Sequence, residues 1–225
     1  MSEETTTTFT PPPNEDGSSL RIGVAGLTLS GIPFFVGGVL VIEAETPPSG
    51  APLLGMLSHA LWALAIVILT VGVVALLRAI PALRRGLAGY LGSGVLGLGV
   101  LHGLQWVTWA YVDVRGARET DRSELLLDAI IVPFGAGHLL MYAILMGAGI
   151  ALFGWAIRQT EFVSRYVAGT GVGLGVITIL TALYPLLLGL GGGSEGHVLF
   201  DIATLLIPVL YVWTMVVGVL VYRRS

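Results

Sequence analysis

The sequence lacks cysteine and lysine altogether, and only 11% of its 225 residues are charged. Without cysteine the chain can form no disulfide, no thiolate metal site and no iron–sulfur cluster, and it has no thiol nucleophile. Without lysine it can form no Schiff base, which excludes a retinal-type pigment. Average proteins carry about 25% charged residues, so the low charge argues against an ordinary soluble domain.

Apolar residues dominate instead and make up 55% of the chain. A helix needs about 20 mainly apolar residues to cross the hydrocarbon core of a bilayer. The sequence therefore predicts an all-α, polytopic membrane helix bundle with six transmembrane helices. The expected spans are 22–42, 53–77, 87–112, 138–157, 166–190 and 198–221.

The fourth span begins inside a longer apolar run, 125–157. As one helix this run would measure about 50 Å, well beyond a hydrocarbon core of about 30 Å. His59 precedes Arg78 by 19 residues and His138 precedes Arg158 by 20, which suggests a duplicated hairpin. The comparison starts the span near residue 138 and leaves 124–137 as an interfacial segment or a helix extension.

Arginine is distributed unevenly between the two sides of a six-span chain. Eight of the eleven basic residues fall on one side: Arg21, Arg78, Arg84, Arg85, Arg158, Arg165, Arg223 and Arg224. Basic residues in short loops stay cytoplasmic, so both termini are predicted inside a cell membrane. Residues 1–20 hold three prolines and a threonine run and are expected to form a disordered cytoplasmic tail, followed by one transmembrane domain at 21–225.

Three of the four histidines share a local pattern, in "SHALWAL" (58–64), "GHLLMYA" (137–143) and "GHVLFDI" (196–202). The second, fourth and sixth helices run in the same direction. His59, His138 and His197 are therefore predicted to form one layer at the outer boundary. Asp201 follows His197 by four residues and shares its helix face.

This layer has a plain interpretation and a chemical one. A histidine at the start of a membrane helix can simply sit at the interface and hydrogen-bond to a neighbour or to water, and this interpretation is preferred. Alternatively, His59, His138, His197 and Asp201 form a divalent metal site with an open position. Such a site could serve an intramembrane hydrolase, with Asp201, Asp128 or Glu195 as general base. The chain is similar in outline to intramembrane zinc hydrolases, although their final helix with paired histidines is missing.

His102 lies deeper in the third span and supports a different reading. Paired with His59 or His138 it could ligate haem b. Six spans with four helix histidines resemble the cytochrome b561 family. That family carries one haem toward each membrane face, whereas here the inner half contains no histidine.

Proline and glycine point to a third reading, transport or the binding of a lipid-like ligand. Pro33, Pro133, Pro185 and Pro208 interrupt apolar runs and can shape a cavity. Glycine pairs with four-residue spacing allow close helix packing within the chain or in a homo- or hetero-oligomer. These pairs are Gly99 with Gly103, Gly169 with Gly173, and Gly171 with Gly175. The sequence has no phosphate-binding loop and no basic patch, which leaves the lipid bilayer as the expected partner and excludes nucleic acid.

The stretch "GHLLMYAILMGAGIALFGWAIRQTEFVSRYVAGTGVGLGVITILTALYP" (137–185) combines small-residue helices, a short arginine-bearing loop and a glycine-rich span. In this it resembles small multi-span prokaryotic membrane proteins built from domains of unknown function. The resemblance implies a membrane location and topology, and it transfers no catalytic residue. The sequence thus predicts an accessory or small-ligand-binding membrane protein, with metal-binding, haem-binding and transporter alternatives still open.

Overall fold

The computed structural model describes residues 17–45, 52–116, 135–187 and 198–225. Side chains are described throughout these ranges except at 41–45, 52, 53, 55, 106, 108–116 and 135–138. The described residues contain helices and no β-strand, and six helical stretches are long and apolar enough to cross a membrane. The predicted all-α bundle of six membrane-spanning helices is thereby confirmed.

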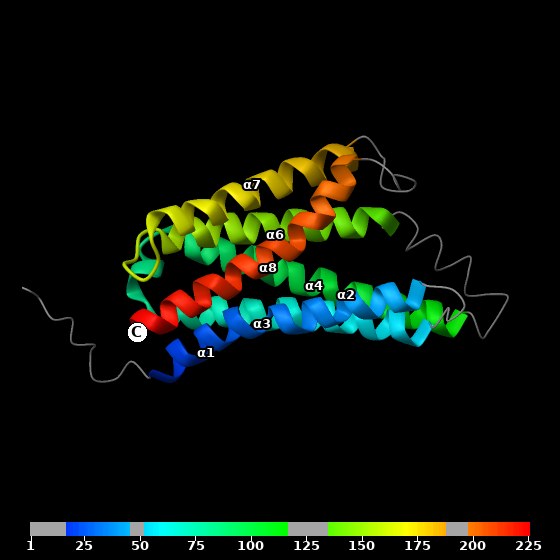
Figure 1. Cartoon of the computed structure of the whole chain (residues 1–225), viewed down its shortest axis with the longest axis horizontal. Helices are drawn as coiled ribbons and strands as arrows, with labels where there is room; N and C mark the ends of the chain where they lie inside the picture. Colours follow the sequence, from blue (N-terminus) through cyan, green and yellow to red (C-terminus); the bar gives the residue numbers. More distant parts are fainter. Residues whose placement is uncertain (1–16, 46–51, 117–134, 188–197) are drawn as a thin grey trace, which may run out of the picture.

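The helices follow the predicted spans closely (Figure 1). In chain order they are α1 (Gly17–Leu29), α2 (Gly31–Glu45), α3 (Pro52–Ala79), the short 3-10 helix η1 (Pro81–Arg84), α4 (Leu87–Gly116), α6 (Gly135–Ile157), α7 (Arg165–Leu187) and α8 (Val198–Arg224). Each long helix is sufficient by itself to cross the membrane, except α1 and α2, which form one crossing together.

The first crossing is interrupted at Ser30, where the sequence predicts a single helix over 22–42. Pro33 has no N–H and cannot donate to the carbonyl of Leu29, so the regular helix is broken there. The Ser30 hydroxyl donates to the carbonyl of Leu27 at 3.1 Å and so satisfies one backbone acceptor beside the break. Helix α1 also begins at Gly17, so residues 17–20 of the expected tail are helical.

The fourth crossing is α6, which begins at Gly135, and its apolar stretch Leu139–Ile157 begins at the first residue of α6 with a described side chain. Residues 135–137 are helical, and the shortened span 138–157 stays a prediction. The remainder of the proposed interfacial segment, 124–134, lies outside the described residues, as do residues 1–16 of the tail.

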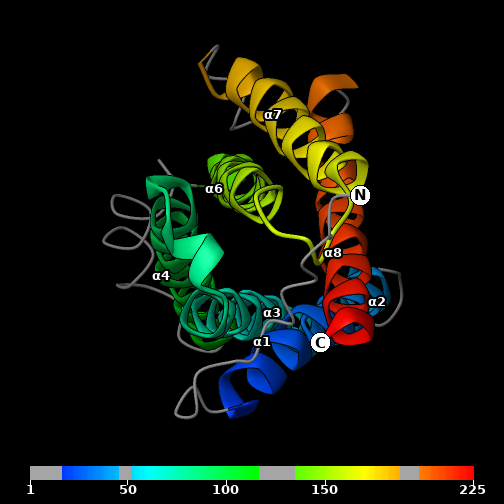
Figure 2. The ribbon, with the colours of Figure 1, turned by 90° about the vertical axis from the view of Figure 1, so that its left-hand side faces the viewer.

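The helices contact one another in a ring, α3 with α4, α4 with α6, α6 with α8, and α8 with α1 and α2, which return to α3. Seen from one end in Figure 2, α7 lies outside this ring, against α6 and α8. Within this ring the packing is sparsest between α2 and α8, and the candidate site lies between these two helices.

Glycines make several of these crossings possible. A methyl group added to Gly26 would meet the backbone of Gly72, so α1 and α3 touch backbone to backbone. At Gly175 it would meet the carbonyl oxygen of Gly147 on α6, and at Gly171 the ring of Trp213 on α8. By contrast, Gly169 and Gly173 have open space beside them. The predicted close-packing role holds for the pair Gly171 and Gly175 within the chain, and a role for Gly169 and Gly173 in oligomers stays a prediction.

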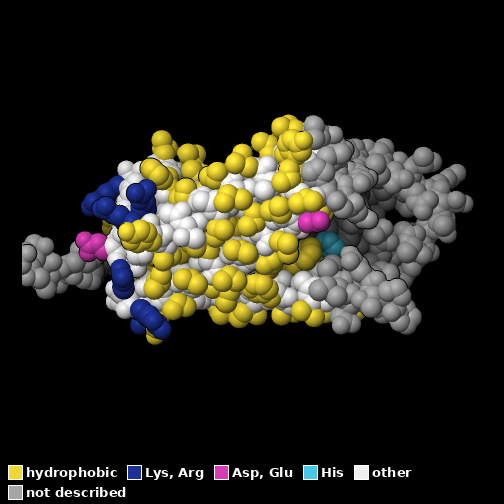
Figure 3. Space-filling model, turned by 45° about the horizontal axis from the view of Figure 1, so that its top comes forward, with side chains coloured by type: hydrophobic (Ala, Val, Ile, Leu, Met, Phe, Trp, Pro, Cys, Tyr) yellow, Lys and Arg dark blue, Asp and Glu magenta, His cyan; other side chains and the backbone are white. Residues whose placement is uncertain are grey.

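All eight arginine side chains that the structure describes lie at one end of the bundle, named here the arginine end (Figure 3). Exposed aromatic side chains accompany them: Tyr90, Trp155, Tyr166 and Tyr222. On α7, Tyr166 and the exposed Tyr184 are 18 residues apart, which is five turns and about 27 Å along one face. Aromatic residues favour both membrane interfaces, and this separation is close to a hydrocarbon core of about 30 Å.

Candidate functional site

An aromatic layer crosses the interior of the helix ring. The ring of Phe34 on α2 stacks on Tyr211 of α8 with centroids 4.3 Å apart and an interplanar angle of 20°. Its centroid lies 6.1 Å from that of Trp62 on α3, at an interplanar angle of 26°. Tyr142 on α6 joins through its hydroxyl, which lies 2.8 Å from the hydroxyl of Tyr211. Four helices therefore meet at one depth through Phe34, Trp62, Tyr142 and Tyr211, defined here as the aromatic layer.

The tyrosine pair supplies the polar part of this layer. Both rings are buried, and one hydroxyl donates to the other. Hydrogen bonds between spanning helices stabilise membrane bundles by about 0.6 kcal/mol on average, because the unfolded chain in the membrane also finds partners. The pair therefore contributes modest stability and fixes the register of α6 against α8.

Two hydrogen bonds hold α2 against α3. The Ser58 hydroxyl donates to the carbonyl of Gly37 at 2.7 Å, and the Trp62 indole N–H donates to the carbonyl of Phe34 at 3.1 Å. The absence of a side chain at Gly37 is required here, because a methyl group would lie 2.8 Å from the Trp62 ring. Helix α2 is thus fixed to α3 on one side of the ring.

On its other side, α2 separates from α8. Near the arginine end the first crossing touches α8 closely, since a methyl group at Gly218 would lie 3.0 Å from both Leu27 and Thr28. At Gly31 it would meet Met215. Farther along, at Gly38, it would have no heavy atom within 4 Å. The two helices therefore diverge toward the end opposite the arginines.

A pocket of about 530 Å³ occupies this divergence. Its lining comes from four helices: Phe34, Phe35, Gly38 and Val39 of α2, Trp62 of α3, Leu139 and Tyr142 of α6, and Thr204, Ile207 and Pro208 of α8. Phe34, Trp62 and Tyr142 of the aromatic layer form its inner end. The walls are almost wholly apolar and aromatic, and most small-molecule sites are likewise lined mainly by such side chains.

Pro208 interrupts the regular backbone hydrogen bonding of α8 beside the pocket. Pro208 has no N–H, so it cannot donate to the carbonyl of Thr204 four residues earlier. Both residues line the pocket. The Thr204 hydroxyl donates instead to the carbonyl of Asp201 at 2.9 Å. The Thr204 carbonyl therefore lacks its regular helical donor, at a residue that lines the pocket.

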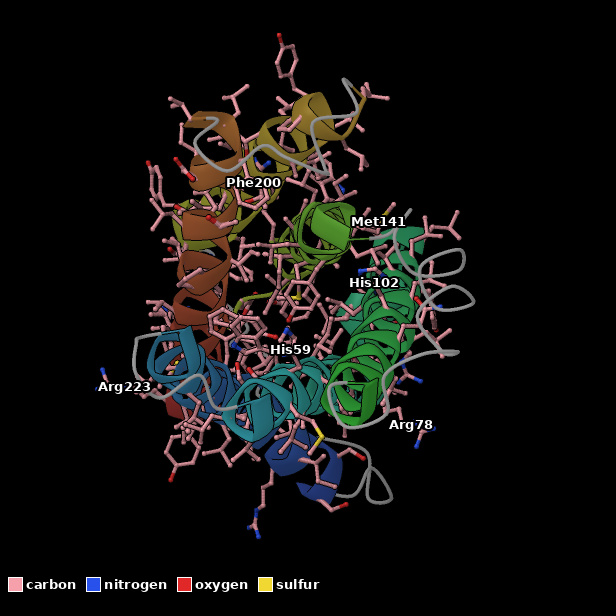
Figure 4. All side chains as sticks on the ribbon, turned by 90° about the vertical axis from the view of Figure 1, so that its right-hand side faces the viewer. His59, Arg78, His102, Met141, Phe200 and Arg223 are labelled. Carbon is pink, nitrogen blue, oxygen red and sulfur yellow. The ribbon has the colours of Figure 1, made fainter. Side chains whose placement is uncertain are left out.

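Two of the four histidines have described side chains, His59 on α3 and His102 on α4, and Figure 4 labels both. His59 lies in the half of α3 opposite Arg78, whereas His102 lies near the middle of α4. His59 on α3 is half-buried, and its ring meets Trp62 edge to face with centroids 5.4 Å apart. His102 on α4 is also half-buried, next to Gly103, where α4 meets Ala63 of α3. His59 thus packs against the aromatic layer, and the plain packing interpretation of the histidines stays a prediction.

The rest of the predicted metal set is only partly described. His138 belongs to the first turn of α6 but its side chain lies outside the described part, and His197, Asp128 and Glu195 lie outside it entirely. Among the described side chains, no group of three or more metal-ligating residues comes together. The metal site of His59, His138, His197 and Asp201, and haem b on His102, stay predictions.

Helix geometry nevertheless separates two members of this set. Measured from the aromatic layer, His59 is three residues beyond Trp62, about 4.5 Å, while Asp201 is ten residues beyond Tyr211, about 15 Å. Asp201 is exposed in the first turn of α8. The two side chains therefore start at different depths, and Asp201 lies about one turn beyond Thr204 on α8.

The pocket itself was not predicted as a set of residues. Its aromatic members stand singly in apolar runs and match no motif. Pro33 and Pro208 were the available signal, because interrupted spans favour cavities. Which helices border the cavity depends on contacts between residues far apart in the chain, such as Phe34 with Tyr211.

Comparison with known proteins adds no family to this description. No family model, no curated protein and no solved structure matches the chain.

Proposed function

We propose that this multi-pass membrane protein binds a lipid-like small molecule in the pocket between α2, α3, α6 and α8. The pocket is the single observation that carries the proposal: about 530 Å³, lined by aromatic and aliphatic side chains from four helices. Known ligand sites have volumes of about 300–1,000 Å³ and similar linings. Among the described residues, those that line the pocket include no carboxylate, imidazole or arginine, which favours binding over acid–base chemistry there.

The position of the pocket supports a ligand that arrives from the bilayer. Phe35 and Val39 border it and are also exposed on the outer surface of α2, where a spanning helix meets lipid. Gly38, between them, leaves the wall of α2 without a side chain. A hydrocarbon chain in the surrounding lipid can therefore reach the pocket laterally between α2 and α8.

Gly38 offers a direct test of the proposal. In Gly38→Leu the new side chain extends into open space in the pocket, so it should fill the site without displacing a helix. The protein in lipid nanodiscs is titrated with terminally brominated dodecanol, whose bromine quenches tryptophan fluorescence on contact. We expect saturable quenching in the wild type, an affinity at least about tenfold lower in Gly38→Leu, and loss of the saturable component in Trp62→Phe.

Gly173→Leu is the matched control, because Gly173 also has open space beside it but lies on α7, away from the pocket. Its titration should equal that of the wild type. Equal binding by Gly38→Leu and the wild type would refute the pocket as the binding site, since the substitution removes its free volume. Size-exclusion profiles of the three proteins check that all are folded.

We further propose that the arginine end faces the cytoplasm and that the protein resides in the cell membrane. The support is the collection of eight described arginines at that end, since basic loops stay cytoplasmic. Because the chain lacks cysteine, single-cysteine variants report orientation without background. Ser225→Cys should react with a membrane-impermeant maleimide only after permeabilisation of cells, and Val198→Cys, at the other end of α8, should react in intact cells. The reverse pattern would overturn this orientation.

A further inference from the structure

Exposed arginine side chains give the arginine end a net positive charge. Eight of them lie there, and Glu161 is the one acidic side chain that the structure describes at this end. Residues 1–16, which lie outside the described part, contain four more acids, yet the eight arginines outnumber all five. The surface therefore attracts anions, and the anionic lipids of the bilayer are the nearest source of them.

Two of these arginines flank the connection between α6 and α7. Gly154 of α6 packs tightly against α7, since a methyl group there would lie 3.1 Å from the carbonyl oxygen of Ala168. Arg158 follows Gly154 by four residues, and Arg165 precedes Ala168 by three. Both arginines thus begin about one turn beyond a close contact of the two helices, which brings their side chains to the same part of the surface.

Contacts within the protein position two of the arginines here. Arg224, at the end of α8, donates from Nη1 to the carbonyl of Glu161 in the connection at 2.5 Å. Figure 2, which looks at the arginine end, shows the connection reaching toward the end of α8. The Cζ atom of Arg158 lies 5.6 Å from the centroid of the Trp155 ring, a cation–π distance. A guanidinium has five N–H donors, so the hydrogen bond of Arg224 leaves donors for a phosphate group.

A row of exposed residues on α7 runs inward from Arg165. Gly169, Gly173 and Ile177 follow it at intervals of four residues and so lie on one side of the helix. A methyl group added to either glycine would have no heavy atom within 4 Å. From Arg165 to Ile177 the helix rises about 18 Å, close to the 15 Å or so of hydrocarbon in one leaflet. Gly169 and Gly173, named here the glycine row, leave space for an acyl chain below the arginines.

Exposed aromatic residues favour a lipid over a soluble phosphate compound as the source of the anion. Trp155 is 50% exposed and Tyr166, next to Arg165, is 89% exposed. Such residues favour the interface between hydrocarbon and head groups, so the neighbouring arginines lie at the depth of lipid phosphates. Arginine binds phosphate through paired N–H groups, and a lipid without a compensating cation in its head group is attracted most strongly.

From these observations we infer that the arginine end binds an anionic phospholipid. Its phosphate is held by Arg158, Arg165 and Arg224, and one of its acyl chains lies along the glycine row. This site is on the outer surface of α6, α7 and α8, and it is independent of the ligand proposed for the pocket.

Native mass spectrometry of the protein in a neutral detergent tests this site, with phosphatidylglycerol and phosphatidylcholine of identical chains as probes. Wild-type protein should bind phosphatidylglycerol at least about tenfold more tightly, as expected for several arginines at one head group. In Arg158→Gln/Arg165→Gln the two lipids should bind within about twofold of each other. Both substitutions are at exposed positions, and an unchanged size-exclusion profile confirms that the variant is folded.

Arg78→Gln/Arg85→Gln is the matched control, because it removes the same charge from the same end but lies at the end of α3 and beside η1. This variant should keep the preference of the wild type for phosphatidylglycerol. An equal loss of preference in both double variants would show that net charge alone attracts the lipid, and the assigned site would be wrong. A wild-type protein that binds both lipids equally would also overturn the inference.

The chain and the source of the phosphate are tested separately. Gly169→Leu occupies the glycine row, so both lipids should bind about threefold more weakly while the ratio of their affinities stays constant. If this variant instead converts a dimer to a monomer and leaves lipid binding unchanged, the glycine row is a contact between copies and the chain position is wrong. Glycerol phosphate at the concentration of the lipid should not displace it, because it lacks the chains. Displacement would identify a soluble phosphate compound as the ligand and overturn the lipid inference.

Discussion

Gly175→Ala is expected to lower the free energy of unfolding by about 2–3 kcal/mol, as overpacking does at a tight contact. The added methyl group would meet the carbonyl oxygen of Gly147 and would lie 2.8 Å from the side chain of Ala151 and 2.9 Å from its backbone nitrogen. Backbone atoms of α6 cannot turn away as a flexible side chain can, so the two helices must separate. Separation breaks contacts along the whole crossing of α6 and α7.

Gly173→Ala is the matched control, one half-turn away on the same helix. Its methyl group would have open space, and alanine is favoured over glycine in a helix by about 0.5–1 kcal/mol. The control should therefore be neutral or slightly stabilising, opposite in sign to Gly175→Ala. Thermal unfolding of both variants in one detergent, followed by size-exclusion chromatography, measures the difference. Equal transition temperatures would show that α6 and α7 do not pack at this distance.

Phe34→Ala is expected to cost about 3 kcal/mol, within the range for removing a large buried side chain. The Phe34 ring is 8% exposed and stacks on Tyr211 on one side, with Trp62 nearby. Its removal leaves both rings without a partner and opens the inner end of the pocket. Because lipid tails gain little by filling this space, the loss comes mainly from packing contacts.

Phe35 provides the comparison, since it neighbours Phe34 and lines the same pocket but is 40% exposed. Phe35→Ala should cost less than about 1 kcal/mol, because few of its contacts are with the protein interior. Chemical denaturation of the two variants in mixed micelles gives both values. A larger loss for Phe35→Ala would contradict the position of the aromatic layer inside the helix ring.

Both predictions depend on differences between residues that the sequence treats alike. Gly173 and Gly175 belong to one glycine-rich run, and each has a partner at four-residue spacing, so the spacing predicts close packing for both. The structure shows that only Gly175 meets another helix. Phe34 and Phe35 are likewise equivalent in composition, and the break at Ser30 together with the bonds from Ser58 and Trp62 decides which ring faces inward.

At the candidate site, too, the sequence could not distinguish residues by their depth or their contacts. The histidine pattern predicted His59, His138 and His197 in one outer layer, and of these three only the side chain of His59 is described. The pattern could not give their depths, because depth depends on where each helix begins and how it tilts. It also gave Asp201 a role as metal ligand, which stays a prediction because His138 and His197 have no described side chains.

By itself, the sequence determined the membrane location of the helices, their number, their approximate bounds and the arginine-rich end. These properties depend on composition and on local length, since each span must be apolar for about 20 residues whatever it touches. The tertiary structure alone decided that α2 and α8 diverge, that Phe34 stacks on Tyr211, and that a pocket opens between them. Lipid is as apolar as the interior, so hydrophobicity cannot specify which faces meet. Which faces meet depends instead on close contacts at glycines, on aromatic packing and on hydrogen bonds between helices distant in the chain.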